Sequence, residues 1–205
     1  MGTDDLFKKA REKREARKSL NKKILDNILI LCEGEKTEPN YFNGIKCKYR
    51  MSNVEIKGLG ANTDTITKIA IKEHRNFSQI WCVFDRDSFD AHNFNRAFQM
   101  IKKYKNIHTA YSNEAFELWY LLHFNYYNTG ITREAYCKKL DKLLGKKYKK
   151  NSTEIYSLIC DKENVAIKNA KRLFDSYPNE NPEKNNPSTT VYKLVEELNK
   201  YKDTF

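Results

Sequence analysis

Three acidic side chains stand directly after apolar stretches of the sequence, where they could bind a metal ion. Glu33 follows the apolar run 28–32, and Asp85 and Asp87 follow the run 79–84. Alternate residues of an extended segment point to the same side, so the two aspartates can face one point. Clustered carboxylates repel one another unless a cation or a proton lies between them. Mg²⁺ usually binds one or two carboxylates and completes its coordination with water and phosphate oxygens.

A magnesium ion at this position would activate a phosphate as a Lewis acid and lower the pKa of a bound water, which is phosphodiester chemistry. The alternative is that the same acids cap loops or helix starts and pair with Arg86 and Lys36, as most surface carboxylates do. An isolated Asp-x-Asp pair is common. Its position after one buried strand, with Glu33 after another, is what favours a metal site.

The apolar runs predict strands that are buried on both faces of a sheet, because they are continuous rather than alternating. Strands are predicted at 27–32, 54–57, 79–84 and 107–112. Helices are predicted between them, from about residue 38 to before 51, at 64–76 and at 90–104, with Thr37 as the N-cap of the first. This alternation predicts an α/β fold with a parallel sheet and helices on its faces. Ligands of such sheets bind beyond the carboxyl ends of the strands, where the three acids lie.

The second half of the chain has only helical patterns. Helices are predicted at 114–124, 133–144, 152–160, 163–174 and 189–201. Three of the four prolines fall in 177–187, which is therefore a loop, and Ser188 or Thr189 is expected to cap the last helix. The predicted organisation is a basic arm at 1–23, an α/β core at 24–125 and an all-helical extension at 126–205 that packs on the core.

The composition favours an anionic partner and a cytoplasmic protein. The chain has 38 Lys and Arg against 27 Asp and Glu, a net charge of +11, which suits nucleic acid or an acidic membrane surface. The apolar runs are far shorter than the roughly 20 residues that cross a bilayer, so no membrane span is predicted. The start of the chain lacks the apolar core of a secretory signal. Five cysteines without a Cys-x-x-Cys pair fit a reducing compartment.

Two lysine-rich segments could contact a nucleic-acid backbone. The arm residues 4–23 hold nine Lys or Arg among four acids, and 138–150 holds seven lysines together with Tyr148. Contacts to phosphates would make binding depend on salt. A solvated tail and a solvated helix end are the alternative interpretations of the two segments.

Four blocks of the sequence, 28–42, 81–88, 111–124 and 186–195, resemble the RloB/AbiLii family. The resemblance covers nearly the whole chain in the right order, and the four blocks together are more specific than any one of them. The family is associated with restriction loci and abortive phage infection, and its core is related to the Toprim fold. The resemblance therefore implies a Toprim-like sheet, with Glu33 as the strand-one glutamate and Asp85 and Asp87 as the pair that holds Mg²⁺ or Mn²⁺.

The resemblance also implies a partner and a further site residue. The family is often encoded beside an ABC-type ATPase, which would make this chain the effector half of a two-part defence system. The usual family block reads Asn-Pro-x-Phe-Glu-Leu-Trp, whereas this chain has Glu114 in place of the proline, so Glu114 is not expected to be a required ligand. Glu117 matches the family residue and is predicted to belong to the site; the alternative is that it only pairs with a lysine.

Residues near the acids are candidates for substrate binding. Lys36 and Thr37 lie next to the glutamates and Arg86 lies between the aspartates, where each could touch a phosphate, although ordinary loop residues would look the same. His123 ends the helix that contains Glu117. It is interpreted either as a core or helix-end histidine, or as a phosphate contact or general base beside the acids.

The hypothesis that joins these observations is a magnesium-dependent nuclease of anti-phage defence that cuts DNA or an RNA such as transfer RNA. Glu33, Asp85 and Asp87 would bind the metal, and Glu35 and Glu117 would assist. The alternative is a non-catalytic subunit that binds nucleic acid or docks to the ATPase. Primase-like or topoisomerase-like chemistry is weaker, because no candidate catalytic tyrosine or template-binding domain is evident. The sequence leaves a homo-oligomer open.

Overall fold

The continuous apolar runs of the sequence form the central strands of one sheet. The computed structural model describes residues 11–13, 27–86 and 91–202. Its five-stranded sheet has the order β2-β1-β3-β4-β5. The strands are β1 (Ile28–Cys32), β2 (Val54–Gly58), β3 (Gln79–Asp85), β4 (Ile107–Asn113) and β5 (Ser188–Thr189). The first four are parallel, so the predicted Toprim-like α/β class with a parallel sheet is confirmed.

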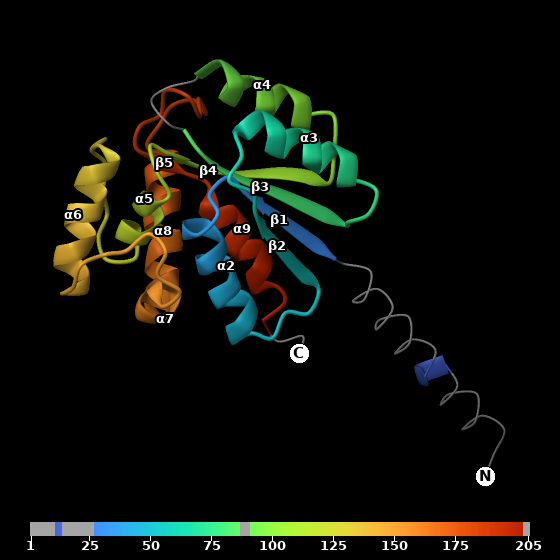
Figure 1. Cartoon of the computed structure of the whole chain (residues 1–205), viewed down its shortest axis with the longest axis horizontal. Coiled ribbons are helices and arrows are strands. Elements are labelled where there is room, and N and C mark those ends of the chain that lie inside the picture. Colours follow the sequence, from blue (N-terminus) through green and yellow to red (C-terminus); the bar gives the residue numbers. More distant parts are fainter. Residues whose placement is uncertain (1–10, 14–26, 87–90, 203–205) are drawn as a thin grey trace, which may run out of the picture.

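Helices cover both faces of the sheet (Figure 1). They are α2 (Thr37–Lys48), α3 (Thr63–Glu73), α4 (Ala91–Ile101), α5 (Glu117–Leu122), α6 (Arg133–Leu144), α7 (Ile155–Ile159), α8 (Glu163–Asp175) and α9 (Val191–Asn199), with a 3-10 turn η1 (Cys160–Lys162). Helices α3 and α4 lie on one face, and α2 and α9 lie on the other. Helices α5 to α8 form the part built mainly from the second half of the chain.

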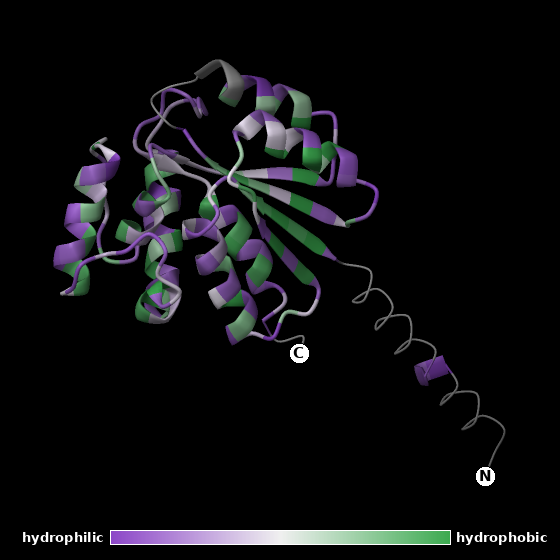
Figure 2. Cartoon of the chain, viewed as in Figure 1, coloured by the Kyte–Doolittle hydropathy of each residue, from purple (hydrophilic) through white to green (hydrophobic). Residues whose placement is uncertain are grey.

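Alternation along each strand divides the buried side chains between two cores. Ile28 and Ile30 of β1 belong to the cluster under α2, α5 and α9, whereas Leu29 and Leu31 belong to the cluster under α3 and α4. Because side chains of a strand point alternately to opposite faces, a strand that is apolar at every position must be covered on both sides. In Figure 2 the central strand β1 is hydrophobic along its length, while the helices are hydrophobic mainly on the side that faces the sheet.

Strand β5 corrects the expectation that the second half is entirely helical. Ser188 and Thr189 pair antiparallel with Asn113 and Ser112 of β4. The hydroxyl of Thr189 donates to the carbonyl of Tyr111 at 3.0 Å and also accepts the amide of Val191 at 3.3 Å. Helix α9 thus begins after Thr190, which makes no side-chain cap. These polar contacts satisfy backbone groups at the edge of β4, which would otherwise be buried without partners.

Three predicted helix starts are also wrong, and one of them is that of α7, which begins at Ile155 rather than at residue 152. Thr37 is the first residue of α2 rather than its N-cap, and its hydroxyl donates to the carbonyl of Lys150 at 3.2 Å. Helix α5 begins at Glu117, three residues later than predicted, and residues 114–116 connect it to β4, which ends at Asn113. The side-chain amide of Asn113 donates to the carbonyls of Pro182 and Glu183, which fixes the end of the strand against the proline-rich loop.

The basic arm predicted at 1–23 lies outside the described residues except for 11–13, which are helical and exposed. Within the described ranges, no helix combines the length and the apolar character that crossing a bilayer requires.

The two-sided core predicts a contrast between two leucines. Leu29 on β1 is 0% exposed, whereas Leu158 on α7 is 40% exposed. Leu29→Ala should lower the free energy of unfolding by about 2 to 5 kcal/mol, because it leaves a cavity in the sheet core. Leu158→Ala makes the same chemical change at the surface and should stay within about 0.5 kcal/mol of the unsubstituted chain. Urea unfolding followed by circular dichroism measures both; equal effects would contradict the assignment of β1 to the core.

Candidate functional site

The acids after the first and third strands meet because β1 and β3 are neighbours. From β1 the chain moves to β2 on one side and then returns to β3 on the other, so the strand order reverses between β1 and β3. Ligands of open α/β sheets bind at this kind of reversal, beyond the carboxyl ends of the strands. Cys32 pairs with Val83, and the amide of Glu33 donates to the carbonyl of Val83 at 2.9 Å.

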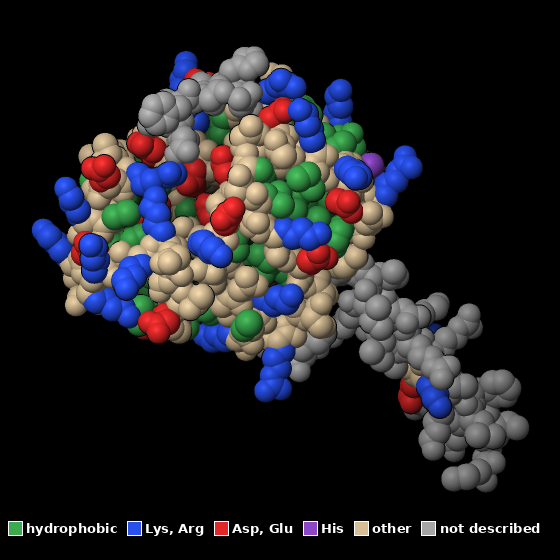
Figure 3. Space-filling model, in the orientation of Figure 1, with side chains coloured by type: hydrophobic (Ala, Val, Ile, Leu, Met, Phe, Trp, Pro, Cys, Tyr) green, Lys and Arg blue, Asp and Glu red, His purple; other side chains and the backbone are tan. Residues whose placement is uncertain are grey.

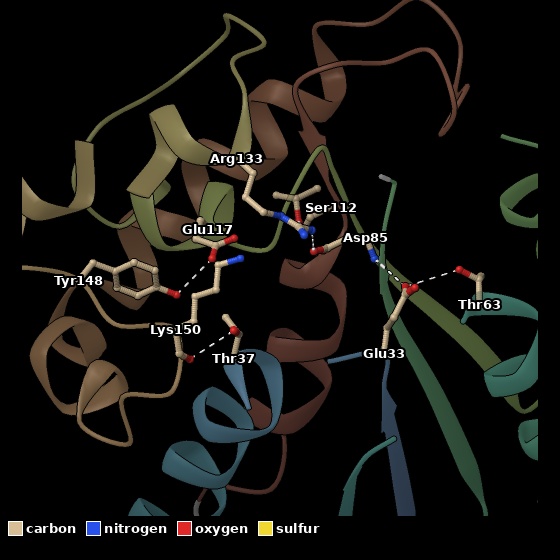
Figure 4. A network of polar contacts seen from close by, with 10 residues as sticks. Glu33, Thr37, Thr63, Asp85, Ser112, Glu117, Arg133, Tyr148 and Lys150 are labelled. Carbon is tan, nitrogen blue, oxygen red and sulfur yellow. Dashed lines mark hydrogen bonds and ion pairs between the residues drawn. The ribbon is translucent and has the colours of Figure 1, made fainter. Parts of the chain in front are cut away.

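The carboxylate of Glu33 is held beside Asp85. Oε2 of Glu33 accepts the backbone amide of Asp85 at 3.3 Å and the hydroxyl of Thr63, the first residue of α3, at 3.5 Å. Figure 4 shows the Glu33 side chain between these two partners. The carboxylates of Glu33 and Asp85 therefore come from adjacent strand ends, and the first is oriented by the backbone that carries the second.

Asp85 is paired with an arginine that the sequence did not single out. Nη2 of Arg133 lies 2.8 Å from Oδ2 of Asp85, and the Asp85 side chain is only 11% exposed. Arg133 is the first residue of α6, after Thr132, whose hydroxyl accepts the amide of Ala135 as an N-cap. Capping fixes where α6 begins, and that position directs the guanidinium toward the sheet (Figure 4).

These residues line a cavity of about 380 Å³ at the carboxyl edge of the sheet. In Figure 3, acidic side chains gather on this face with lysines and arginines on both sides of them. The lining residues are Glu33, Gly34, Glu35, Lys36, Thr37, Glu38, Asp85, Phe116, Glu117, Arg133, Lys150 and Asn151. The two halves of the chain both contribute, and a volume of this size suits a ligand-binding site.

The helical half supplies a second group of polar residues to the cavity. Glu117 is 2% exposed and accepts the hydroxyl of Tyr148 at 3.4 Å. Lys150 extends toward Glu117 in Figure 4, and its backbone carbonyl accepts the hydroxyl of Thr37. A buried carboxylate is stabilised by hydrogen bonds and by nearby positive charge, both of which are present here.

Glu38 is the lining acid that sequence reasoning missed. It lies in the first turn of α2 and is 4% exposed. An acid in the first turn of a helix is common, because it interacts favourably with the helix dipole, so its sequence position gave no sign of burial. The signal that could have identified it is its place in the block from Glu33 to Pro39, where the chain leaves the sheet at the functional edge.

Comparison with known families identifies the chain. The model of the family described as RloB-like protein matches residues 28–198. The chain belongs to the RloB-like family. A search of curated proteins and a search of solved structures each gave no match. The RloB-like match extends from β1 to α9, so it includes every residue that lines the cavity.

Only some of the remaining predicted site residues of this RloB-like chain line the cavity. Lys36, Thr37 and Glu35 line the cavity, as expected for residues beside Glu33. Arg86 does not line it, and its backbone amide donates to the carbonyl of Ser112 at 2.8 Å. Asp87 lies outside the described residues.

His123 lies in the core of the RloB-like chain and does not line the cavity. Its Nδ1 donates to the carbonyl of Trp119 at 2.9 Å, and its Nε2 is 3.5 Å from the hydroxyl of Tyr41. Burial lowers its pKa to about 4, although the hydrogen bond to Trp119 opposes that shift. The structure thus favours the core interpretation of His123 over that of a phosphate contact or general base.

The donor chemistry of the site fits a hard divalent cation. Glu33 and Asp85 supply two carboxylates at adjacent strand ends, and one or two carboxylates is what Mg²⁺ usually takes from a protein. Within the described part of the chain, no group of three or more His, Cys, Asp and Glu side chains is arranged to hold a metal ion. The described part of the site therefore offers two carboxylates to a metal ion, and Asp87, the other predicted ligand, lies outside it.

Buried His123 predicts a pH dependence of stability. Its folded-state pKa of about 4 is below the roughly 6.5 of an unfolded histidine, so the neutral form favours folding. The contribution is present above pH 6.5 and is lost as the pH falls toward 4, by up to about 3 kcal/mol. His123→Gln should lack this pH-dependent contribution to the free energy of unfolding. His74→Gln, a change at the C-cap of α3, should keep it. Denaturant unfolding at pH 7 and pH 4.5 tests this; parallel pH profiles for the parent chain and His123→Gln would contradict it.

Proposed function

We propose that this RloB-like protein is a metal-dependent nuclease that cuts phosphodiester bonds of DNA or RNA. The observation that carries the proposal is the meeting of Glu33 and Asp85 at the reversal of strand order, inside a cavity that also contains Arg133 and Lys150. Carboxylates could hold a metal ion, and cations beside them could bind a phosphate, so one cavity contains both requirements of phosphodiester cleavage.

The chain's own residues would orient and neutralise the substrate. Mg²⁺ or Mn²⁺, held by Glu33 and Asp85 with Asp87 as the expected third ligand, would act as a Lewis acid on the phosphate. Arg133 presents a planar guanidinium that can bind two phosphate oxygens at once. Lys150 adds a positive charge beside Glu117 (Figure 4).

A run of exposed lysines extends the cationic surface away from the cavity. Lys146, Lys147 and Lys149 are exposed in the loop after α6, and Lys150 at the end of this run lines the cavity. A nucleic-acid backbone has regularly spaced phosphates, so such a run suits a strand that enters the site along this loop. This supports the proposed use of the lysine-rich segment 138–150.

The proposed biological role is that of an effector in anti-phage defence, acting with an ABC-type ATPase. The resemblance to RloB/AbiLii proteins supports this role, because those proteins are associated with abortive infection and with such an ATPase. The second candidate is a non-catalytic subunit that binds nucleic acid or docks to the ATPase. The ion pair between Asp85 and Arg133 favours it, since the arginine already neutralises a carboxylate that would otherwise bind metal.

The nuclease proposal predicts that cleavage depends on Asp85. Purified chain should cut plasmid, single-stranded DNA or total RNA with Mg²⁺ or Mn²⁺ and stop when EDTA is added. Asp85→Asn should lower the rate by about 100-fold or more, because it removes negative charge from the metal site. Asp161→Asn is the matched control, since Asp161 is exposed on η1 outside the cavity. If Asp85→Asn and the parent chain cut equally well, the assignment fails. Tight binding without cleavage by either favours the non-catalytic subunit.

The lysine run predicts a local change in the salt dependence of binding. Lys146, Lys147 and Lys149 changed together to Gln, in the Asp85→Asn background, should weaken binding to a labelled oligonucleotide. The slope of log affinity against log salt should fall in magnitude by about 2 to 3. The same triple change at Lys102, Lys103 and Lys105, exposed near the amino end of β4, removes equal charge and should alter the slope less. Fluorescence anisotropy across a salt series measures both; equal slopes would mean that only net charge matters.

A further inference from the structure

Glu38 is a buried acid in the cavity for which the proposed metal site provides no role. It is 4% exposed and lines the cavity with Glu33, Asp85 and Glu117. It is also five positions beyond Glu33, on the first turn of α2 rather than at a strand end. Its position is therefore set by a different element from those that position the acids on the sheet.

The start of α2 is fixed tightly enough to hold the Glu38 side chain in one place. The hydroxyl of Tyr120 donates to the carbonyl of Thr37 at 3.0 Å, and the hydroxyl of Thr37 donates to the carbonyl of Lys150. The carboxyl group lies directly over Gly34, where a Cβ atom would overlap Oε2 of Glu38. Gly34 thus leaves the space that the buried acid occupies.

Oε2 of Glu38 is buried and has no hydrogen-bond partner among the described residues. A buried polar atom without a partner costs about 1 to 3 kcal/mol. Because Glu38 lines the cavity, a ligand there toward which the carboxyl group turns would supply the missing partner. That ligand could be a cation or an oxygen that accepts a proton. Arg133 and Lys150 lie close enough to lower the pKa of Glu38. Their positive charges disfavour a second metal ion at Glu38.

The surroundings of Glu38 favour the protonated acid. Burial raises its pKa above the usual range, and the negative charge of Glu117 on α5 raises it further. A hydrogen bond from its own backbone amide, Arg133 on α6 and Lys150 in the following loop lower the pKa and oppose this shift. A carboxylic acid can donate one hydrogen bond through its proton, whereas a carboxylate can only accept.

We propose that Glu38 is the general acid of this site and gives its proton to the leaving oxygen of the phosphodiester. This inference rests on the proposed nuclease function. Water adds to phosphorus as the bond from phosphorus to the leaving oxygen breaks, and the proton of Glu38 passes to that oxygen, which becomes an alcohol. The attacking water loses a proton to solvent, and the Glu38 carboxylate later regains one from solvent. The net reaction is hydrolysis to an alcohol and a phosphate monoester.

A sulfur leaving group tests the assignment, because a thiolate leaves without protonation. The substrates are matched DNA and RNA oligonucleotides with all-oxygen linkages, or with sulfur in the 3′- or 5′-bridging position of one linkage. With Mn²⁺, Glu38→Gln should slow cleavage at the all-oxygen linkage by about 100-fold to 10,000-fold. At a linkage whose leaving atom is sulfur, the cleavage rate of Glu38→Gln should stay within about threefold of that of the parent chain. Glu55→Gln, at an exposed glutamate of β2 paired with Lys57, is the matched control and should cut both as the parent does.

Two further measurements separate a proton donor from a metal ligand and from a structural residue. Mn²⁺ affinity, measured by calorimetry without nucleic acid, should be unchanged in Glu38→Gln. In the unsubstituted chain, the rate at the all-oxygen linkage should fall as the pH rises through the pKa of Glu38, and the sulfur linkage should lack this fall. This second measurement needs no variant, so it holds even if Glu38→Gln does not fold.

The outcomes distinguish this inference from the function on which it rests. If Glu38→Gln slows both linkages equally, or loses Mn²⁺ affinity, Glu38 is not the general acid although the protein is a nuclease. If the cleavage rate at the sulfur linkage also falls as the pH rises, Glu38 is likewise not the general acid. If the unsubstituted chain cuts no linkage under any condition, the nuclease proposal fails and the general acid fails with it.

Discussion

The parallel pairing of β1 with β3 determines where the chemistry of this protein can occur. Both strands end at the same edge, so Glu33 and Asp85 lie next to each other there although 52 positions separate them in the sequence. The pairing is itself a consequence of burial, because strands that are apolar on both faces are stable only in the middle of a covered sheet. The same physical requirement that forms the core therefore brings the two carboxylates together. The other residues of the cavity come from α2, α5, α6 and the loop after α6, which lie around these two carboxylates.

The helical half, which packs on the sheet through a shared hydrophobic core, also compensates the charge of the acids at the sheet edge. The five acids that line the cavity, three of them near the ends of β1 and β3 and one each on α2 and α5, would repel one another in a partly dry cavity. Arg133 from α6 and Lys150 from the following loop supply the opposite charge, and hydroxyls of Thr63 and Tyr148 supply hydrogen bonds. Part of the negative charge of the cavity is therefore neutralised by side chains of this chain.

The sheet and the acids at its edge could be predicted from sequence, whereas the residues opposite them could not. Continuous apolar runs mark buried strands, and the residue after a strand end is then known to lie at the edge. Arg133 pairs with Asp85, which lies 48 positions earlier in the sequence. This pair could not be predicted, because helical periodicity shows which face of α6 is buried but not which side chain reaches another element. Strand β5 has two residues, Ser188 and Thr189, too few and too polar to show a strand pattern. The residue type of His123 did not reveal its burial.

The contribution of both halves to one cavity has a consequence for how the protein is made. Chains emerge from the ribosome with the N-terminal part first, and domains fold as their segments become available. The segment from β1 to α5 holds all the acids of the described cavity, but Arg133 and Lys150 follow later, and β5, which closes the edge of β4, follows later still. A nascent chain therefore carries the acids and Lys36 before it carries Arg133 and Lys150. Under the proposed nuclease function, the phosphate-binding part of the cavity is completed only after α6 and the loop that follows it have been made.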